Sequence, residues 1–498
     1  MDRKKIVRNI ATTLLLQLVA VANGLIVPQI FISIFGSETN GLVTSITQLL
    51  NYVSLLEGGL SGVVMASLYK PLRENDHQRV SAIVNATRRF FKQIGVIYIV
   101  YTIAVAVIYP LVIKTELTYT YVMILTLVLA VNLFVQYFFS ITYQILIRAA
   151  QRGYVTTLTK AGTMLLNIVL VVVLTKLFPD LIFVKAAGAL VLFLQPVVYA
   201  AYTKKHFQLD RTVPSDDNAI KERWSGFGHM LAYFINTNVG VLLLTAFSTL
   251  SAVSVYAVYL MITNAIRNLS VAIASAVMPS LGDVMAAGDK DKSNKAFSTY
   301  EFGMAYFTTL LFTCGVILLI PFVSVYTANF TDAQYIQPVF GILLMAAETI
   351  FCFREPYINA AYAAGHFKQT VKYAWGEVVI HVSIALLLVH KFDLIGIALG
   401  FLVAVAYRTV AHVLYLKKNI LYRPIRKFVK ISALFLGTAL ALVAAANLWL
   451  PLDEIDSYFQ WFQNAVIVFC GTALALGLVS VIAFREELKS IIRKKAKR

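Results

Sequence analysis

Long apolar stretches alternate with short polar segments along the whole chain. Fourteen of these stretches are long enough, at about 1.5 Å of helix per residue, to cross about 30 Å of hydrocarbon. Lipid cannot hydrogen-bond to backbone groups, so such segments satisfy them internally, as α-helices. The pattern therefore predicts an all-α polytopic membrane protein with about 14 transmembrane helices. The predicted spans are 6–34, 41–67, 90–113, 119–147, 155–178, 181–203, 227–247, 252–279, 303–326, 338–363, 371–391, 394–416, 428–450 and 461–484.

Positive charge is sorted onto one side of these spans. The two tails and the even-numbered loops, with their flanking residues, carry 36 of the 43 Lys and Arg residues. The odd-numbered loops carry only Lys114, Lys176, Lys185 and Lys391. Lys and Arg near span ends remain on the cytoplasmic side, so both termini are predicted to be cytoplasmic. Merging or splitting one span would exchange the sides of all later loops, so the asymmetry also supports the number of spans.

The composition narrows the class of protein further. A mean hydropathy of +0.75 with 59% hydrophobic residues is too apolar for a soluble protein of 498 residues. The net charge of +18 is explained by basic loops beside anionic lipid headgroups, including the basic tail 493–498, rather than by nucleic-acid binding. Cys314, Cys352 and Cys470 all lie within spans, so no disulfide framework or metal pattern is expected. The first apolar stretch is too long for a signal peptide and has no small-residue cleavage site, so we interpret it as a retained helix.

An internal repeat indicates how the spans are grouped. Asp180-Leu-Ile and Asp393-Leu-Ile begin spans six and twelve, and Tyr202-Thr-Lys-Lys and Tyr415-Leu-Lys-Lys end them. The offset is 213 residues, with a one-residue slip between these ends. Chance similarity between apolar helices is the alternative, but the matching charged ends argue against it. Six spans per half make the repeats parallel, related by an axis along the membrane normal. The predicted parts are an N-terminal six-helix lobe (1–203), a cytoplasmic connector (204–226), a C-terminal six-helix lobe (227–420), and two extra helices with a basic cytoplasmic tail (421–498).

Polar and charged side chains recur inside the spans. Each costs a few kcal/mol in lipid unless it faces a bundle interior or a wet cavity. In span four the polar residues are four apart, which keeps them on one slowly rotating helix face. Polar stripes on so many helices predict a shared water-filled cavity between the two lobes. The residues predicted to line it are Gln48, Gln136, Gln144, Arg148, Asn236, Asn264, Arg267, Asn268, Arg354 and Arg408. The residues predicted to couple transport to a proton or sodium gradient are Glu57, Glu348, Glu355 and His381.

Arg267 is the strongest candidate for substrate binding. It lies near the middle of span eight and has no acidic neighbour in its own helix. A guanidinium in this position suits an anionic group such as a phosphate, which it can hold with two hydrogen bonds. Isolated amides and hydroxyls have a structural alternative, because such groups often join neighbouring helices. The structural alternative for His381 is a satisfied interior histidine rather than a proton relay.

Several of the charged residues also have structural interpretations. Arg354 could simply neutralise Glu348 or Glu355 on its own helix. Glu377 and Arg408 lie toward the cytoplasmic ends of their spans, from which long side chains can reach the interface. For these residues the sequence leaves both interpretations open.

An enzymatic function is not expected. A membrane glycosyltransferase, polymerase or ligase would carry acidic or histidine residues on a sizeable outer loop, and the outer loops here are short, apart from the acidic segment 451–460. The chain has no phosphate-binding glycine loop and no nucleophile elbow. The sequence therefore predicts no catalytic residues, no metal site and no cofactor.

Several motifs resemble those of a known family. The chain is similar, along essentially its whole length, to bacterial Wzx-type polysaccharide flippases of the multidrug/oligosaccharidyl-lipid/polysaccharide (MOP) superfamily. Each motif is only moderately specific, but their order and spacing agree with the family. The motifs are Gly36-Ser-Glu-Thr-Asn-Gly, Glu57-Gly-Gly-Leu, Ser67-Leu-Tyr-Lys-Pro-Leu-Arg-Glu-Asn-Asp, Asn264-Ala-Ile-Arg, Met278-Pro-Ser-Leu-Gly and Gly288-Asp-Lys.

The resemblance implies a transporter in the bacterial cytoplasmic (inner) membrane. Its substrate would be an undecaprenyl-diphosphate-linked oligosaccharide, moved from the inner to the outer leaflet by alternating access for export of a capsule, exopolysaccharide or related glycan. The family fold has two six-helix lobes around a cationic cavity, and Arg267 matches a basic cavity residue by position. Span one has Gln17 and Asn23 where lipid II flippases have arginines, although the fourteen spans leave that assignment open. The resemblance implies membrane lipids, a polysaccharide polymerase and the export machinery as partners.

Three alternatives remain open at this point. A lipid II or teichoic-acid precursor flippase would keep the same chemistry with another headgroup. A multidrug or cation antiporter of the same superfamily should have an acidic cavity. A non-transporting scaffold of a polysaccharide assembly complex would not depend on its cavity. For a transporter, Pro28, Gly58, Gly59 and Pro356 are predicted flex points, and the last two spans could form a groove for the polyprenyl tail.

Overall fold

The computed structural model describes residues 3–57, 60–217, 227–286 and 289–488. The predicted flex points Gly58 and Gly59, residues 218–226 of the connector, Gly288 of the eighth-span motif, and the basic tail from 489 lie outside the described residues. The described residues form helices and no β-strand. The predicted all-α class is therefore confirmed.

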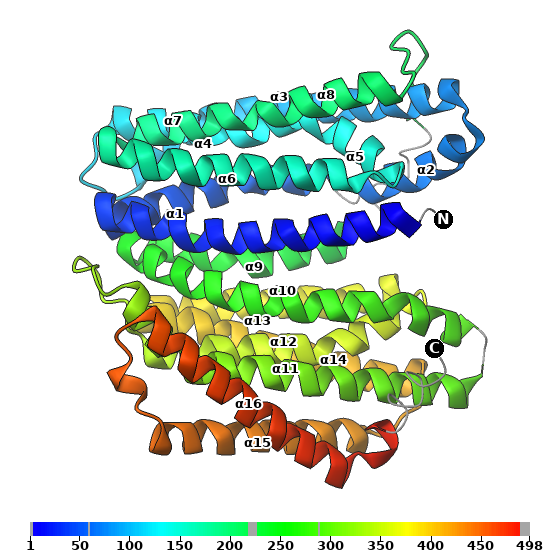
Figure 1. The fold of residues 1–498 in the computed structure, drawn as a ribbon, viewed down its shortest axis with the longest axis vertical. Coiled ribbons are helices and arrows are strands. Elements are labelled where there is room, and N and C mark those ends of the chain that lie inside the picture. Colours follow the sequence, from blue (N-terminus) through cyan, green and yellow to red (C-terminus); the bar gives the residue numbers. More distant parts are fainter. Residues whose placement is uncertain (1–2, 58–59, 218–226, 287–288, 489–498) are drawn as a thin grey trace. The chain divides into compact units, whose positions relative to one another are not determined.

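The chain forms two compact units. Unit 1 comprises Met1–Phe234 with Thr249–Ser254, and unit 2 comprises Ile235–Ser248 with Val255–Arg498. The division predicted from the repeat, with its separate connector and C-terminal pair, stays a prediction. The elements of unit 1 are α1 (Arg3–Asn51), η1 (Tyr52–Glu57), α2 (Leu60–Glu74), α3 (His77–Val112), α4 (Tyr119–Val135), η2 (Gln136–Ser140), α5 (Ile141–Ala149), α6 (Gly153–Leu177), α7 (Leu181–Leu192) and α8 (Leu194–His206), and Figure 1 shows them in blue to green.

The first two predicted spans form one helical run with two interruptions. Gly36 breaks α1 with φ 83° and ψ 166°, a left-handed conformation that glycine adopts without strain. The helix then tightens into a 3₁₀ segment at Tyr52–Glu57 before α2 begins at Leu60. Span two is therefore a discontinuous helix, an arrangement that transporters use near binding sites.

Twelve helical runs in the described residues are long and apolar enough to cross a membrane. One of them, Ala11–Glu57, contains both of the first two predicted spans on either side of Gly36. The remaining predicted span corresponds to α12 (Pro338–Ala363), whose Glu348, Arg354 and Glu355 reduce its apolar character. The fourteen predicted spans thus correspond to twelve long apolar runs, one break and one charged helix.

Unit 2 contains most of the helices from α9 onward, although the first part of α9, up to Phe234, and the first turn of α10 belong to unit 1. Its elements are α9 (Phe227–Phe247), α10 (Leu250–Ala286), α11 (Lys290–Tyr326), α12, α13 (Phe367–Phe392), α14 (Leu394–Asn419), α15 (Ile425–Trp449), η4 (Leu452–Glu454) and α16 (Tyr458–Ala483).

The two C-terminal helices, α15 and α16, pack on α11, and Figure 1 shows α16 running obliquely across α15. The Trp461 indole donates to the Leu318 carbonyl over 3.1 Å, and the Tyr306 hydroxyl donates to the Ala473 carbonyl over 3.2 Å. These bonds tie α16 to α11 at two levels. The outward faces of the helices remain apolar, with Leu387, Leu448 and many similar side chains exposed. Such a surface requires lipid around it, so the chain is a multi-pass membrane protein.

Candidate functional site: a cationic cavity and a charged network

Unit 1 contains a polar cavity of about 450 Å³ between α1, α4 to α8 and the π-helical segment η2. Its polar lining is rich in amides and includes two lysines, and none of the described lining residues is a carboxylate. The polar lining residues are Asn23, Thr47, Asn132, Gln136, Ser140, Gln144, Lys160, Thr163, Asn167, Lys185 and Gln195.

A π-helical turn explains how one helix supplies four of these side chains. At about 100° per residue, each four-residue step along an α-helix rotates a side chain about 40° further around the axis. The π turn at Gln136–Ser140 contains an extra residue, so each of its residues rotates less around the axis. This smaller rotation offsets part of the drift of about 40°. Asn132, Gln136, Ser140 and Gln144 consequently all face the cavity, as predicted for a single face. Turns of this kind occur frequently at functional sites.

Some cavity groups have no hydrogen-bond partner within the described protein. Ser140 is 2% exposed, and its hydroxyl has none. The Oδ1 atom of Asn23 is likewise buried without one. Buried polar groups are nearly always hydrogen-bonded, to water if not to protein. These two groups therefore indicate that the cavity holds water or a polar ligand.

The sequence analysis did not predict the two lysines of the cavity as lining residues. It counted Lys185 with the outer loops, although the predicted span 181–203 contains this residue, and it did not single out Lys160. The structure places Lys160 within α6 and Lys185 in the second turn of α7. The Lys185 ammonium lies 3.8 Å from the centre of the Phe31 ring, a cation–π contact. An ionisable residue two turns inside an apolar span was the signal that could have identified Lys160.

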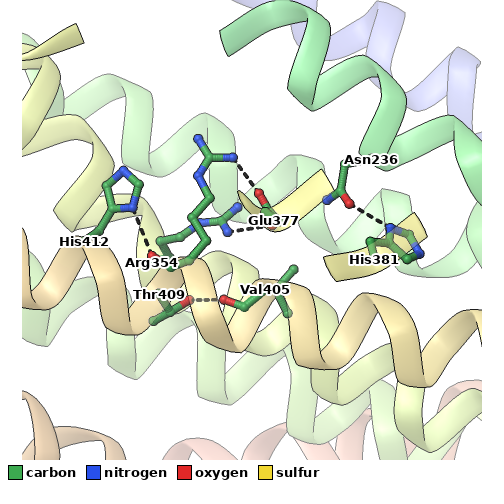
Figure 2. A network of polar contacts seen from close by, with 8 residues as sticks. Asn236, Arg354, Glu377, His381, Val405, Thr409 and His412 are labelled. Atoms are coloured by element: carbon green, nitrogen blue, oxygen red, sulfur yellow. Dashed lines mark hydrogen bonds and ion pairs between the residues drawn. The ribbon is translucent and has the colours of Figure 1, made fainter. Parts of the chain in front are cut away.

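Unit 2 contains a buried network of opposite charges instead of an open cationic site. Glu377 on α13 receives Arg354 Nη1 of α12 at 2.7 Å and Arg408 Nη1 of α14 at 2.6 Å, and Figure 2 shows the two guanidinium groups converging on this carboxylate. Glu377 and Arg354 are each 1% exposed. Glu377 and Arg408 therefore do not reach the interface, and Arg354 pairs with Glu377 rather than with Glu348 or Glu355.

Arg267 also has an acidic partner. Its Nη1 lies 2.9 Å from Glu348 Oε1 on α12, and its Nη2 donates to Asn264 Oδ1 at 2.5 Å. The sequence analysis considered only acidic residues in the same helix. It therefore missed Glu348, which lies 81 residues further along the chain on another helix. The charge of Arg267 is thus compensated within unit 2, which weakens the argument for a free cation at this position.

The other predicted site residues are distributed over several places. In unit 2, His381 Nδ1 lies 2.7 Å from Asn236 Oδ1, as Figure 2 shows. Glu355 is half-buried and makes no ion pair with the described residues, and Asn268 is exposed. In unit 1, Gln48 is half-buried but does not line the cavity.

Two further predicted residues lie in unit 1. Arg148 lines a separate surface pocket with Arg73, and its Nε lies 3.5 Å from Thr156 Oγ1. Glu57 Oε1 accepts a hydrogen bond from the Tyr137 hydroxyl at 2.9 Å. The predicted lining residues therefore form groups within each unit, and a single cavity shared by both lobes stays a prediction.

Sequence reasoning missed a second acidic centre in unit 2. Glu301 on α11 accepts from the Tyr357 hydroxyl and pairs with Arg423, which precedes α15. Within the described residues there is no cluster of three or more His, Cys, Asp or Glu side chains that could hold a metal ion.

Comparison with solved structures shows which known fold the chain shares. The lipid II flippase MurJ in an inward-closed conformation aligns with a TM-score of 0.71, at 13% identity, over 96% of this chain and 99% of its own. An inward-facing MATE-family multidrug transporter of the MOP superfamily aligns with a TM-score of 0.62, at 16% identity, over 80% of this chain and 94% of its own. An outward-facing structure of this kind aligns with a TM-score of 0.60, at 15% identity, over 86% and 96%.

The chain therefore has the fold of MOP-superfamily transporters, and the resemblance seen in its motifs is confirmed at the level of the fold. The sequence itself matches no family model and no curated protein.

Proposed function

We propose that this protein is a flippase that moves an undecaprenyl-diphosphate-linked oligosaccharide from the inner to the outer leaflet by alternating access. The observation that carries the proposal is the cavity of unit 1, whose described lining has two lysines, many amides and no carboxylate. A pocket of this composition favours an anionic, hydroxyl-rich ligand.

The chemistry of the lining fits both parts of such a substrate. Lysine ammonium groups hold diphosphate oxygens as point charges, and they act more strongly at the low dielectric of a membrane protein than in water. The side chains of Asn132, Gln136 and Gln144 offer donors and acceptors that match sugar hydroxyls. An amide lining dehydrates a sugar at lower cost than an apolar one, because each hydroxyl finds a new partner.

The two lysines lie toward opposite ends of the cavity. Lys160 is 17 residues before the end of α6 at Leu177, and Lys185 is four residues after the start of α7 at Leu181. Because a short turn makes these helices antiparallel, the rise of about 1.5 Å per residue separates the lysines by about 20 Å along the helix axes. We propose that they offer successive partners for a negatively charged group that crosses the membrane.

A multidrug antiporter is the alternative that the same fold allows. Organic cations would require a carboxylate in the cavity to offset the loss of their hydration. The lining favours the opposite charge, so we place cation export second. Efflux of a cationic dye from cells that express the protein would support it.

A lipid II flippase is a second candidate because of one observation. The alignment with MurJ covers 96% of this chain, whereas those with the inward-facing and outward-facing MATE transporters cover 80% and 86%. The larger share of the chain that matches the lipid II flippase supports a substrate with a polyprenyl tail. The headgroup distinguishes the two candidates, and direct competition between lipid II and a lipid-linked oligosaccharide would rank them.

The coupling group, the location and the partners are further parts of the proposal. Glu57 accepts from Tyr137 and makes no ion pair with the described residues, whereas Glu348 is paired with an arginine, so we propose Glu57 for proton or sodium coupling. We place both termini in the cytoplasm, and we propose a polysaccharide polymerase and export machinery as partners.

The test is transbilayer movement of a fluorescent polyprenyl-diphosphate oligosaccharide in proteoliposomes. We expect Lys160→Gln to reduce the initial rate by at least tenfold. Lys176→Gln is the matched control, since Lys176 is an exposed lysine of the same helix that does not line the cavity. Transport at the wild-type rate by Lys160→Gln would exclude the cavity as the diphosphate site. No transport by the wild type, with an imposed ion gradient and a matched glycan, would exclude the flippase.

A further inference from the structure

A basic pocket lies on the surface of unit 1, apart from the polar cavity. It has a volume of about 640 Å³ and is lined by Arg88, Arg89, Lys92 and Arg211, together with the apolar side chains of Val96 and Ile97. Three of the cations come from α3, and the fourth comes from the segment that follows α8. The proposed function does not use this pocket.

Hydrogen bonds hold the segment 207–217 against α3, and this segment contributes Arg211 to the pocket. Asn85 Nδ2 donates to the carbonyl oxygens of Asp210 and Val213, both at 3.0 Å. The Asp210 N–H donates to Ser81 Oγ at 3.0 Å, and the Asp216 N–H donates to the Ala82 carbonyl at 3.2 Å. Four hydrogen bonds therefore hold the segment that contains Arg211 against α3.

Positive charge exceeds negative charge in this pocket. Of its four cations, Arg89 is paired with Asp217, at 3.9 Å, and both side chains are well exposed, so the pair contributes little. Arg88 donates to the neutral side chain of Asn85 at 3.3 Å. A phosphate group would find several uncompensated donors here.

The apolar surface beside the pocket continues into the membrane. Val96, Val100 and Ile103 on α3 are exposed by 56%, 65% and 54%, and they follow the basic residues at helical spacing. In a membrane helix, exposed aliphatic side chains face lipid tails, and basic residues one turn nearer the end lie at headgroup level. Basic pockets on the cytoplasmic side bind anionic lipid headgroups.

We propose that this pocket is a binding site for the headgroup of an anionic phospholipid, with the acyl chains along the exposed face of α3. The charge distribution places the site in the cytoplasmic leaflet. Soluble phosphate would be attracted by the same cations but would gain nothing from the aliphatic face. The lipid is therefore the ligand that fits both halves of the site.

The experiment measures lipid binding to the purified full-length protein by native mass spectrometry, with phosphatidylglycerol as the probe and phosphatidylcholine as the uncharged comparison. Each cation near a membrane surface strengthens anionic lipid binding by about fivefold. We expect the double variant Arg88→Gln/Lys92→Gln to bind phosphatidylglycerol about 25-fold more weakly. Lys418→Gln, an exposed lysine near the end of α14, is the control and should bind normally.

A second variant tests the fastening of the segment. Asn85→Leu keeps all four cations but removes the two bonds that hold the segment with Arg211, so we expect binding to weaken by about the effect of one charge. Unchanged binding by the double variant, or equal binding of the two lipids, would overturn the proposal. Displacement of the lipid by inorganic phosphate or pyrophosphate at equal concentration would also overturn it, since the ligand would then be a soluble anion.

Discussion

Replacing Glu377 by glutamine tests whether the buried network of unit 2 stabilises the fold. Glu377 is the only partner that Arg354 and Arg408 share among the described residues, and it receives them at 2.7 and 2.6 Å. Glutamine has nearly the same shape but is neutral and offers one acceptor oxygen. Its amide group would face the donors of the second arginine. Two buried guanidinium groups would thus lose their compensating charge.

The expected magnitude follows from this geometry. Removing one partner of a buried ion pair costs about 3–5 kcal/mol. For soluble domains of 150–250 residues, 1 kcal/mol corresponds to about 2–4 °C in Tm. We therefore expect the Tm of the Glu377→Gln variant to fall by about 6–20 °C. The measurement is a thermal unfolding curve in mild detergent, followed by size-exclusion chromatography of the protein that remains folded.

A matched control shows whether the loss of stability comes from the lost charge of Glu377 or from any substitution in this part of unit 2. Glu355 is a neighbouring carboxylate on α12 that makes no ion pair with the described residues. Glu355→Gln should change the Tm by only a few degrees. Replacing all three members of the network by methionine should recover much of the stability, because no charge is then left unpaired. A Glu377→Gln variant that melts with the wild type, or together with Glu355→Gln, would refute this reasoning.

Two further predictions concern the backbone. A Cβ atom at Gly41 would lie 1.7 Å from the carbonyl oxygen of Leu250 in the first turn of α10, so Gly41→Ala should lower the Tm strongly, whereas Gly62→Ala, which meets no atom within 4 Å, should not. Asp289 caps α11, and the backbone N–H of Lys292, with other hydrogen bonds to the carboxylate, lowers the pKa of Asp289. The stabilisation by this cap should therefore be fully present above the ordinary pKa of aspartate and lost as the pH falls through the lowered pKa. Hydrogen exchange at the Lys292 amide should accelerate in that lower pH range in the wild type but not in Asp289→Asn.

The spans could be predicted from the sequence because lipid imposes one requirement on every spanning segment. Unpaired backbone groups are excluded, so length and apolarity nearly determine the helix. Helix ends were less predictable where a helix extends beyond its apolar span into polar sequence. The helix α11 begins at Lys290, well before the predicted span at 303, because its first turns are polar and need no lipid. The break at Gly36 lies in the interval 35–40 that the sequence analysis left between the first two spans, because the apolar pattern is interrupted there.

The site was less predictable, because it depends on which helices face one another. Four polar residues of span four line one cavity, as expected from their four-residue spacing, since that pattern is local, whereas Arg148 at the next step lines another pocket. The partner of Arg267 was not, because Glu348 lies on another helix. Lys160 and Lys185 were not predicted to line a cavity, because charge counting treats every lysine near a span end as a marker of sidedness. Only the packing of α6 against α7 shows that both side chains line a cavity.

The internal repeat gives these differences a common explanation. The 213-residue offset that relates Tyr202 to Tyr415 also relates Met164 to Glu377 and Gln195 to Arg408. In unit 1 the two neutral residues line the cavity, whereas in unit 2 their counterparts form a buried ion pair. If the predicted repeat holds, corresponding helix pairs contain an open polar space in unit 1 and a pair of opposite charges in unit 2.

If this explanation is correct, the ion pair should be transferable. Met164→Glu/Gln195→Arg should keep the fold and abolish transport, because the new pair would occupy the cavity. Each single substitution should lower the Tm, since it leaves one charge in the cavity without its partner. Equal stability of the single and double variants would show that the two positions do not face each other, and the correspondence between the copies would then be wrong.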